Sequence, residues 1–405
     1  MNNTFLSKDI LLQVDKPARY IGNEQNMCIK NPDDVDIRIA FCFPDVYEIG
    51  MSNIGMQIIY ELFNRRPDTY CERVFSPWVD LDKVMREKNI ELFTLETQTP
   101  VHQLDFLAFT MGYELCYSNI LQVLELSHIP FFSKDRTEDD PIVFGGGTCA
   151  YNPEPIADFF DFLYIGEAET KYDEVMDLYA KMKKGNQGRK AFLHEVAKIE
   201  GIYVPSLYEP SYNEDGTLKA FTPLYDDIPT KIKRQVVVNM DKVKFIDKPI
   251  VPFIKVTQDR VVLEIMRGCI RGCRFCQAGV IYRPLREHSV EYLKDYAVKM
   301  LDLTGAEEIS LSSLSSSDYS KIEELLEFLI EYTKKKKINI SLPSLRIDAF
   351  SLDVMNKVQD VKKSSLTFAA EAGTQRLRDV INKGITEEDI MKGSLEAFKG
   401  GWNKV

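Results

Sequence analysis

The sequence predicts an α/β protein built from two parallel-sheet domains. Short apolar segments alternate with stretches of helical periodicity from residue 36 to about 170, and again from residue 254 onward. Strands that alternate with helices form parallel sheets whose faces the helices cover. At 405 residues, the chain is long enough for two or three hydrophobic cores. We therefore expect a leader at 1–35, a first domain at 36–170, a connector at 171–253 and a second domain at 254–405.

The first domain is predicted from apolar strands and the helices between them. The expected strands are 37–43, 105–110, 141–144 and 161–165, and the expected helices are 53–64 and 117–126. Helix 117–126 has apolar residues at 120, 121, 124 and 126, which is the spacing of one helical face. The connector is predicted to begin with amphipathic helices over 167–199 that are interrupted at 185–188. Short strands should follow, with a hairpin turn at Asp215 and Gly216.

The second domain begins with an apolar, β-branched segment at 261–266, which predicts a buried strand. Helix and strand then alternate again. The further expected strands are 308–312, 338–342 and 366–370, and the expected helices are 289–302, 319–334, 351–359 and 374–382. Helix 319–334 should be capped near Ser317 or Asp318, because a serine-rich run precedes it. This order predicts a second sheet whose parallel strands end at a common edge.

Charge and composition exclude several classes of protein. The formal net charge of −11 argues against a broad nucleic-acid surface, although the basic segment 231–248 is a candidate RNA contact. The basic run 334–337 is predicted to end a helix. No signal-peptide pattern and no run of about 18 apolar residues occurs, so we expect a cytoplasmic protein without membrane contact. Five cysteines are dispersed singly and are expected to be buried thiols: Cys28, Cys42, Cys71, Cys116 and Cys149.

Three further cysteines lie close together directly after the strand expected at 261–266. They are Cys269, Cys273 and Cys276, with the spacing C-x3-C-x2-C. Three thiolates fill three corners of a four-iron cluster, which needs four ligands, and leave the fourth iron open. A zinc site with His288 as the fourth ligand is the alternative, because Cys273 and Cys276 have zinc-knuckle spacing. A disulfide would leave one thiol over and requires an oxidising compartment.

This loop, with Phe275 inside it, a strand before it and β/α units after it, resembles the radical S-adenosylmethionine (SAM) superfamily. The resemblance implies a partial (β/α)6 barrel with a [4Fe–4S] cluster and SAM at the carboxyl ends of its strands. It implies SAM contacts at Phe275, Ser313, Ser315, Arg346 and Glu371. Arg346 suits a carboxylate but could form a surface salt bridge, and Glu371 could instead cap a helix. Residues 400–405 look like the opening of a fifth strand, so we expect a core truncated before its last strands.

A second resemblance concerns the first domain. The segments 45–50, 118–120 and 145–147 are similar to the cobalamin-binding pattern D-x-H-x-x-G, S-x-L and G-G. The resemblance implies a Rossmann-like domain with a site made of Asp45, Tyr47, Gly50, Ser118, Gly145 and Gly146. In that family the histidine binds cobalt, and Tyr47 stands in its place here. Because a phenol cannot replace an imidazole as a nitrogen ligand, cobalamin either binds without a protein ligand or has been lost.

The whole chain, including the leader segment 16–22, resembles a family that joins a cobalamin-type domain to a radical SAM core and whose reaction is unsettled. The resemblance implies reductive cleavage of SAM to a 5′-deoxyadenosyl radical that acts on an unknown substrate, with RNA modification or methyl transfer as leading interpretations. It implies a one-electron reductant such as flavodoxin or ferredoxin. A cobalamin-dependent radical methylase, or a non-catalytic iron–sulfur or zinc protein that binds a partner, are the alternatives. No catalytic residue is predicted.

Overall fold

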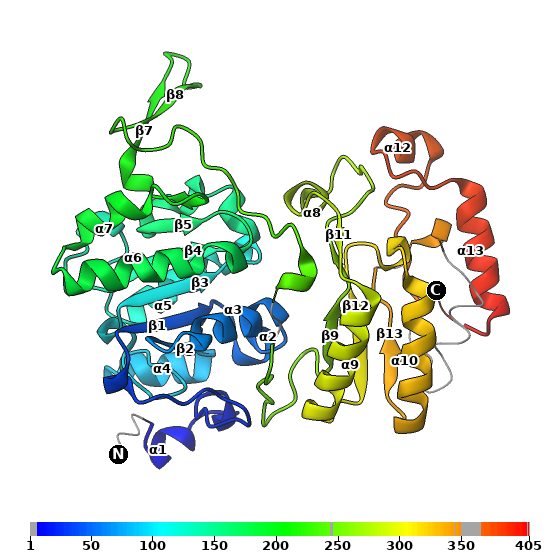
Figure 1. The fold of residues 1–405 in the computed structure, drawn as a ribbon, viewed down its shortest axis with the longest axis horizontal. Coiled ribbons are helices and arrows are strands. Elements are labelled where there is room, and N and C mark those ends of the chain that lie inside the picture. The colour runs from blue at the N-terminus through cyan, green and yellow to red at the C-terminus, as the bar shows by residue number, and fades with distance from the viewer. Residues whose placement is uncertain (1–5, 244–245, 345, 350–365, 403, 405) are drawn as a thin grey trace. The chain divides into compact units, whose positions relative to one another are not determined.

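The computed structural model describes residues 6–243, 246–344, 346–349, 366–402 and 404. It divides the chain into two compact units (Figure 1). The first unit comprises Met1–Val237 and Phe245–Gln258, and the second comprises Val238–Lys244 and Asp259–Val405. Within the described ranges, no helix combines the length and the apolar character needed to cross a bilayer.

The first unit is a six-stranded sheet in the order β2-β1-β3-β4-β5-β6, with helices packed on it (Figure 1). Its strands are β1 (Ile37–Phe43), β2 (Thr69–Phe75), β3 (Phe106–Thr110), β4 (Ile142–Gly146), β5 (Phe162–Tyr164) and β6 (Ile202–Tyr203). All neighbours pair in parallel except β5 and β6. The four expected strands are confirmed. Strand β2 escaped prediction because polar residues interrupt its apolar pattern, although every one of its residues is buried.

Seven helices of the first unit are described. They are α1 (Lys8–Leu11), α2 (Tyr47–Gly50), α3 (Ile54–Arg65), α4 (Val79–Lys88), α5 (Tyr117–Leu126), α6 (Tyr172–Lys184) and α7 (Arg189–Val196). Helix α3 begins after Asn53, whose side chain accepts a hydrogen bond from the Met56 amide at 3.1 Å and so caps the helix. Helices α3, α5, α6 and α7 confirm the predicted helices, whereas α4 was not predicted.

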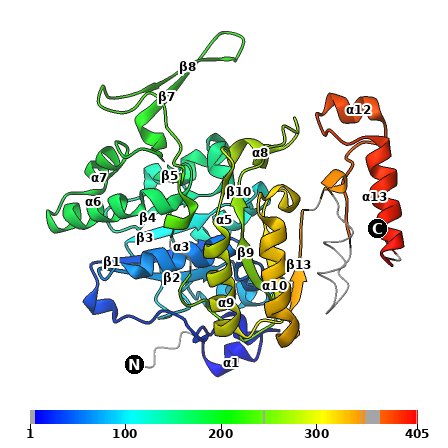
Figure 2. The same ribbon diagram turned by 45° about the vertical axis from the view of Figure 1, so that its right-hand side comes forward.

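A β-hairpin extends from the first unit, away from its six-stranded sheet (Figure 2). It consists of β7 (Tyr208–Tyr212) and β8 (Leu218–Pro223), which pair antiparallel. Gly216 has φ +81° at its turn, a backbone conformation that favours glycine. The hairpin turn expected at Asp215 and Gly216 is therefore confirmed.

The second unit alternates strands and helices around a three-stranded parallel sheet in the order β13-β12-β9. These strands are β9 (Val261–Glu264), β12 (Glu308–Ser312) and β13 (Asn339–Ser341), and a short antiparallel pair joins β10 (Met266–Arg267) to β11 (Arg286–Glu287). The described helices are α8 (Gln277–Ile281), α9 (Val290–Thr304), α10 (Ile322–Lys336), α12 (Gln375–Val380) and α13 (Glu387–Lys399). The structure confirms the three strands. It also confirms the predicted helices that correspond to α9, α10 and α12.

Three expectations for the second unit fail. Residues 366–370 are not a strand, and Leu366 instead packs against Ala397 and Trp402. An apolar run becomes a strand only where a sheet edge offers it a hydrogen-bonding ladder, and among the described residues the sheet ends at β13.

The other two failures concern the strand expected from residue 400 and the start of helix α10. The strand expected from residue 400 is absent in the described residues, because α13 extends to Lys399 and a turn follows it. Helix α10 begins after Lys321 rather than at Ser317 or Asp318, since Ser316–Asp318 form a separate 3-10 turn. The helix expected at 351–359 lies outside the described residues.

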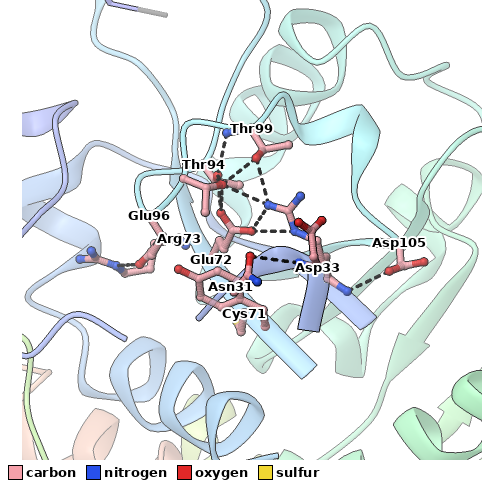
Figure 3. A network of polar contacts seen from close by, with 12 residues as sticks. Asn31, Asp33, Cys71, Glu72, Arg73, Thr94, Glu96, Thr99 and Asp105 are labelled. Carbon is pink, nitrogen blue, oxygen red and sulfur yellow. Dashed lines mark hydrogen bonds and ion pairs between the residues drawn. The ribbon is translucent and has the colours of Figure 1, made fainter. Parts of the chain in front are cut away.

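A buried charge network joins the leader to the edge strand of the first unit. The Arg73 side chain is 1% exposed, donates to both carboxylate oxygens of Glu24 at 2.9 and 2.8 Å, and donates to Glu96 at 2.7 Å. Figure 3 shows the contact of Arg73 with Glu96, and beside it the Thr94 hydroxyl that donates to Glu72. Charges without solvent are stable only when paired, so Arg73 holds the leader and the 94–99 loop on β2.

Replacing Arg73 with leucine should leave two buried carboxylates without their cation. We expect Arg73→Leu to lower the free energy of unfolding of the first unit by about 3–5 kcal/mol. Urea unfolding followed by Trp78 fluorescence, in a Trp402→Phe background, measures it. Lys190 is exposed, so Lys190→Leu should change the same free energy of unfolding by less than about 0.5 kcal/mol. Equal effects of the two substitutions would contradict the assigned role.

Candidate active site at the strand ends

The three cysteines lie on one loop, residues 268–276, directly after β10 and beyond the carboxyl end of β9. We call this segment the cysteine loop. All three are free thiols with partial exposure. The Arg271 amide donates to the Cys269 sulfur at 3.4 Å, and the Gly279 amide donates to the Cys276 sulfur at 3.2 Å. Backbone amides donate in the same way to the sulfur ligands of iron–sulfur clusters.

The start of the cysteine loop requires glycine. Gly268 has φ +90°, and a Cβ there would stand 2.7 Å from the Tyr282 carbonyl oxygen. The chain can therefore make the sharp turn out of β10 only with this residue. That turn sets the direction in which the three thiols leave the sheet.

The donor set fits an iron–sulfur cluster by its chemistry. Three free thiols lie within eight residues, and two of them accept backbone hydrogen bonds. Across the described ranges, no three His, Cys, Asp or Glu side chains converge as a ready-made metal site, these cysteines included.

A bidentate ion pair ties the cysteine loop to the next strand. Arg271, between the first two cysteines, donates from Nε to Asp318 Oδ2 at 2.9 Å and from Nη2 to Oδ1. Asp318 follows β12 and also accepts a hydrogen bond from the Ser315 hydroxyl at 2.7 Å. Burial opposes ionisation of Asp318, but Arg271 and Ser315 outweigh it and lower its pKa. The carboxylate is thus held charged against the loop.

The loops after β12 and β13 are bound to each other as well. The Ser316 hydroxyl donates to the Pro343 carbonyl at 2.8 Å and lies 2.9 Å from the Ser313 hydroxyl. The Arg346 guanidinium binds both carboxylate oxygens of Asp348, each at 2.9 Å. Ser315 and Arg346 are buried, so the serine-rich segment is a packed loop rather than a flexible linker.

The turn after α12, residues 380–384, docks on the cysteine loop from the other direction. We call it the Asn-Lys turn. The Asn382 side-chain amide donates to the Gly272 carbonyl at 2.7 Å, and the Arg274 amide donates to the Ile381 carbonyl at 2.9 Å. A segment more than 100 residues away in sequence therefore fixes the middle of the cysteine loop.

Lys383 of the Asn-Lys turn links the remaining predicted contacts. Its amino group lies 5.7 Å from the centre of the Phe275 ring and 3.1 Å from Glu371 Oε1. Its carbonyl accepts a hydrogen bond from Arg346 at 3.0 Å. The structure thus brings the cysteine loop and the five residues expected to contact SAM into one connected network. Sequence reasoning missed Arg271, Asp318, Asp348, Asn382 and Lys383, although Arg271 lies between two cysteines.

The zinc alternative gains no ligand from His288. Its ring is fully buried, its Nδ1 lies 3.0 Å from Asp241 Oδ1, and it stacks on Tyr292. Burial lowers the pKa of His288 to about 4. His288 therefore stays neutral and acts in the packing of the segment before α9.

Four of the six cobalamin-like residues lie at the carboxyl edge of the first unit's sheet, namely Asp45, Ser118, Gly145 and Gly146. Asp45 follows β1 and accepts a hydrogen bond from Tyr113, which follows β3. Ser118 is exposed on the first turn of α5, and Gly145 and Gly146 end β4. Their positions agree with the rule that ligands of parallel sheets bind at this edge.

The other two, Tyr47 and Gly50, lie in the core. Tyr47 is buried, its hydroxyl donates to Glu24 at 2.8 Å, and its ring packs against Phe75. Gly50 also faces Phe75, since a Cβ at Gly50 would stand 2.2 Å from that ring. A Cβ at Gly145 would meet Met111 and Phe160 within 2.8 Å. These residues therefore serve internal packing, and Tyr47 does not fit as a ligand to cobalt.

Two family models match the chain, one in each unit. The model described as "Radical SAM proteins, N-terminal" matches residues 55–205, and the "Radical SAM superfamily" model matches residues 263–405. An uncharacterized protein of Methanocaldococcus jannaschii is 26% identical over 377 residues, covering 91% of this chain and 68% of its own length.

Two solved structures share the fold. The cobalamin-dependent SAM radical enzyme OxsB with aqua-cobalamin bound matches with a TM-score of 0.56 and 14% identity, over 91% of this chain and 48% of its own. The radical SAM methyltransferase TsrM of Kitasatospora setae, with cobalamin and a [4Fe–4S] cluster bound, matches with a TM-score of 0.56 and 11% identity, over 90% and 67%. The chain spans about half the length of OxsB.

Breaking the pair between Arg271 and Asp318 should loosen the cysteine loop. We expect Asp318→Asn to speed amide hydrogen exchange in residues 268–276 by about tenfold, because a charge-assisted bidentate pair is lost. Exchange measured by mass spectrometry tests this. The exposed Asp295→Asn on α9 is the matched control and should leave the loop unchanged. Unaltered exchange in Asp318→Asn would contradict the anchoring role.

Proposed function

The chain is an enzyme of the radical SAM superfamily, and from this premise we propose that it cleaves SAM reductively at a cluster held by Cys269, Cys273 and Cys276. The observation that carries the proposal is the cysteine loop itself. Its three free thiols lie beyond the carboxyl end of β9, and side chains from three other segments bind the loop or one another around it.

The residues around the loop have distinct proposed roles. When bound, the cluster would supply the electron that breaks a carbon–sulfur bond of SAM to give a 5′-deoxyadenosyl radical. Arg271 and Asn382 hold the loop, and Phe275 lies on its surface with 52% of its area exposed. Ser313 and Ser315 belong to the loop after β12. Their side chains are small, so a ligand can come close to the backbone there.

We propose residues 254–405 as the radical SAM core and residues 36–170 as a cobalamin-binding-like domain, with 171–253 as the connector between them. The two family matches, to residues 55–205 and 263–405, support two domains, although the first match and strand β6 of the same sheet extend past residue 170. A one-electron reductant such as flavodoxin or ferredoxin would supply the core. Methyl transfer and RNA modification are the proposed reaction classes. Similarity to TsrM supports the first, and the basic segment from Lys231 supports the second.

A cobalamin-dependent radical methylase is the second candidate. It is supported by the fold shared with OxsB and TsrM, and by Asp45, Ser118 and Gly146 at one sheet edge. Because Tyr47 is turned into the core, any cobalamin would bind without a ligand from that position.

The proposed chemistry is tested with protein reconstituted anaerobically with iron and sulfide. We expect the wild type to retain iron and, with reductant and SAM, to form 5′-deoxyadenosine, quantified by chromatography. Cys269→Ala should lose the iron and the product, because only two thiolates remain. Cys28→Ala removes a thiol elsewhere that is also partly exposed, rather than buried as the sequence predicted, and should keep both the iron and the product. An iron-loaded wild type that leaves SAM intact would overturn the proposal.

The role of Tyr47 is tested separately by titrating cobalamin into the protein. We expect Tyr47→Phe to leave the absorbance change and the retained cobalamin as they are in the wild type. The same variant should lose about 1–2 kcal/mol of stability, because the buried Glu24 loses a donor. A change in the cobalamin spectrum with Tyr47→Phe would show that the phenol reaches the cofactor.

A further inference from the structure

The hairpin formed by β7 and β8 has two unlike faces. Residues paired across two strands share a face, and side chains alternate between the faces along each strand. The apolar face consists of the pairs Tyr208–Pro223, Pro210–Phe221 and Tyr212–Leu218. The opposite face carries the pairs Glu209–Thr222 and Ser211–Ala220. The hairpin therefore has the pattern of a sheet with one side to be buried and one side facing water.

Only the base of the apolar face is covered. There Tyr208 is buried, and its ring stacks on that of Phe221 with the ring centres 5.3 Å apart. Toward the turn, 61% of Tyr212 and 58% of Leu218 are exposed. Figure 2 shows the hairpin standing clear of the six-stranded sheet. Because a two-stranded hairpin is marginally stable by itself, an apolar face left open on one is a surface for a partner.

The edges of the hairpin are unsuited to the addition of a further strand. Pro210 in β7 and Pro223 in β8 lack an amide hydrogen, and the pairing register shifts between Ser211 and Tyr212. These features interrupt the regular row of donors and acceptors that strand addition requires. A partner should therefore bind to the apolar face rather than extend the hydrogen-bonding ladder.

The charge of the hairpin favours a protein partner over a nucleic acid. Segment 208–228 contains five acidic residues and one lysine, which gives it a net charge of −4. Phosphate groups would be repelled by this charge. Two of the acids, Glu214 and Asp215, are exposed at the turn, at the far end of the hairpin. The partner should therefore present a basic group to the turn.

The chain itself carries such a group at the base of the hairpin. The Tyr208 hydroxyl donates to the Pro229 carbonyl at 2.7 Å, so Pro229 lies at the base. Lys231 follows two residues later, is exposed and begins the basic run 231–234. If two hairpins pack face to face in opposite directions, each acidic turn lies beside the basic base of the other copy. The same surface then serves both copies, and the assembly closes as a two-fold dimer.

We propose that the apolar face of the hairpin binds the same face of a second copy of the chain, packed in the opposite direction. The inference goes beyond the proposed function and does not depend on it. With six residues from each copy, the contact is smaller than the roughly 20–30 residues a side of a standard interface. The dimer should therefore form and dissociate reversibly with protein concentration.

Sedimentation velocity of the full chain over a range of about 1–100 μM tests the apolar contact. We expect a monomer–dimer equilibrium in which Tyr212→Ser combined with Leu218→Ser raises the dimer Kd about tenfold or more, because two apolar side chains leave the contact. Leu395→Ser on α13 is the matched control, since Leu395 is 55% exposed, and should leave the Kd unchanged. A wild type that stays monomeric over the whole range would overturn the proposal.

A charge exchange tests the opposite direction of packing and leaves the apolar face intact. At low salt, Glu214→Lys alone and Lys231→Glu alone should each raise the dimer Kd about fivefold, because like charges then meet at both ends of the contact. In an equimolar mixture of the two variants, each turn meets a base of opposite charge, so dimers should form with the wild-type Kd. Variants that stay equally weak when mixed would overturn the proposal. A monomer that binds a single-stranded oligonucleotide through Tyr212 would also overturn it, since the face would then be a nucleic-acid surface.

Discussion

Parallel pairing is the constraint on which both units depend. Parallel strands send all their carboxyl ends to one edge, so side chains that are distant in sequence meet there. In the second unit this edge gathers the cysteine loop and the loops after β12 and β13. In the first unit it gathers Asp45, Tyr113 and Gly146. The chemistry of each unit is therefore concentrated at a single edge, while the strands supply the packed frame.

Ion pairs serve two purposes in this molecule, and burial separates them. The two ion pairs of Arg73, with Glu24 and with Glu96, are buried. Losing Arg73 would leave unpaired charges in the core. Around the cysteine loop the pairs are partly exposed, and Lys383 with Glu371 is held by one contact. A buried network gives a fixed fold, whereas partly exposed pairs are screened by water and contribute less to stability.

The sequence predicted the parallel sheets well, because apolar strands such as 37–43 and 308–312 carry a clear pattern. It failed where tertiary context decides. Strand β2 contains Glu72 and Arg73, which are buried only because partners from other segments neutralise them. Residues 366–370 have the composition of a strand, but they form no hydrogen-bonded ladder with a neighbouring strand. At the site, the cysteine spacing and Glu371 were visible, but the partners Asp318 and Lys383 were not, since only folding brings them to the loop. The sequence shows that Tyr47 stands in place of histidine, but it does not show that Tyr47 lies in the core.

The central claim is that three thiolates of the cysteine loop leave one iron open for SAM. Mössbauer spectroscopy of protein reconstituted with ⁵⁷Fe tests it most directly, because it resolves the individual irons. We expect about four irons per chain, of which one changes its parameters when SAM is added while three keep theirs. Four irons whose parameters all stay the same when SAM is added would contradict this claim. A chain that takes up zinc in place of iron would contradict it as well.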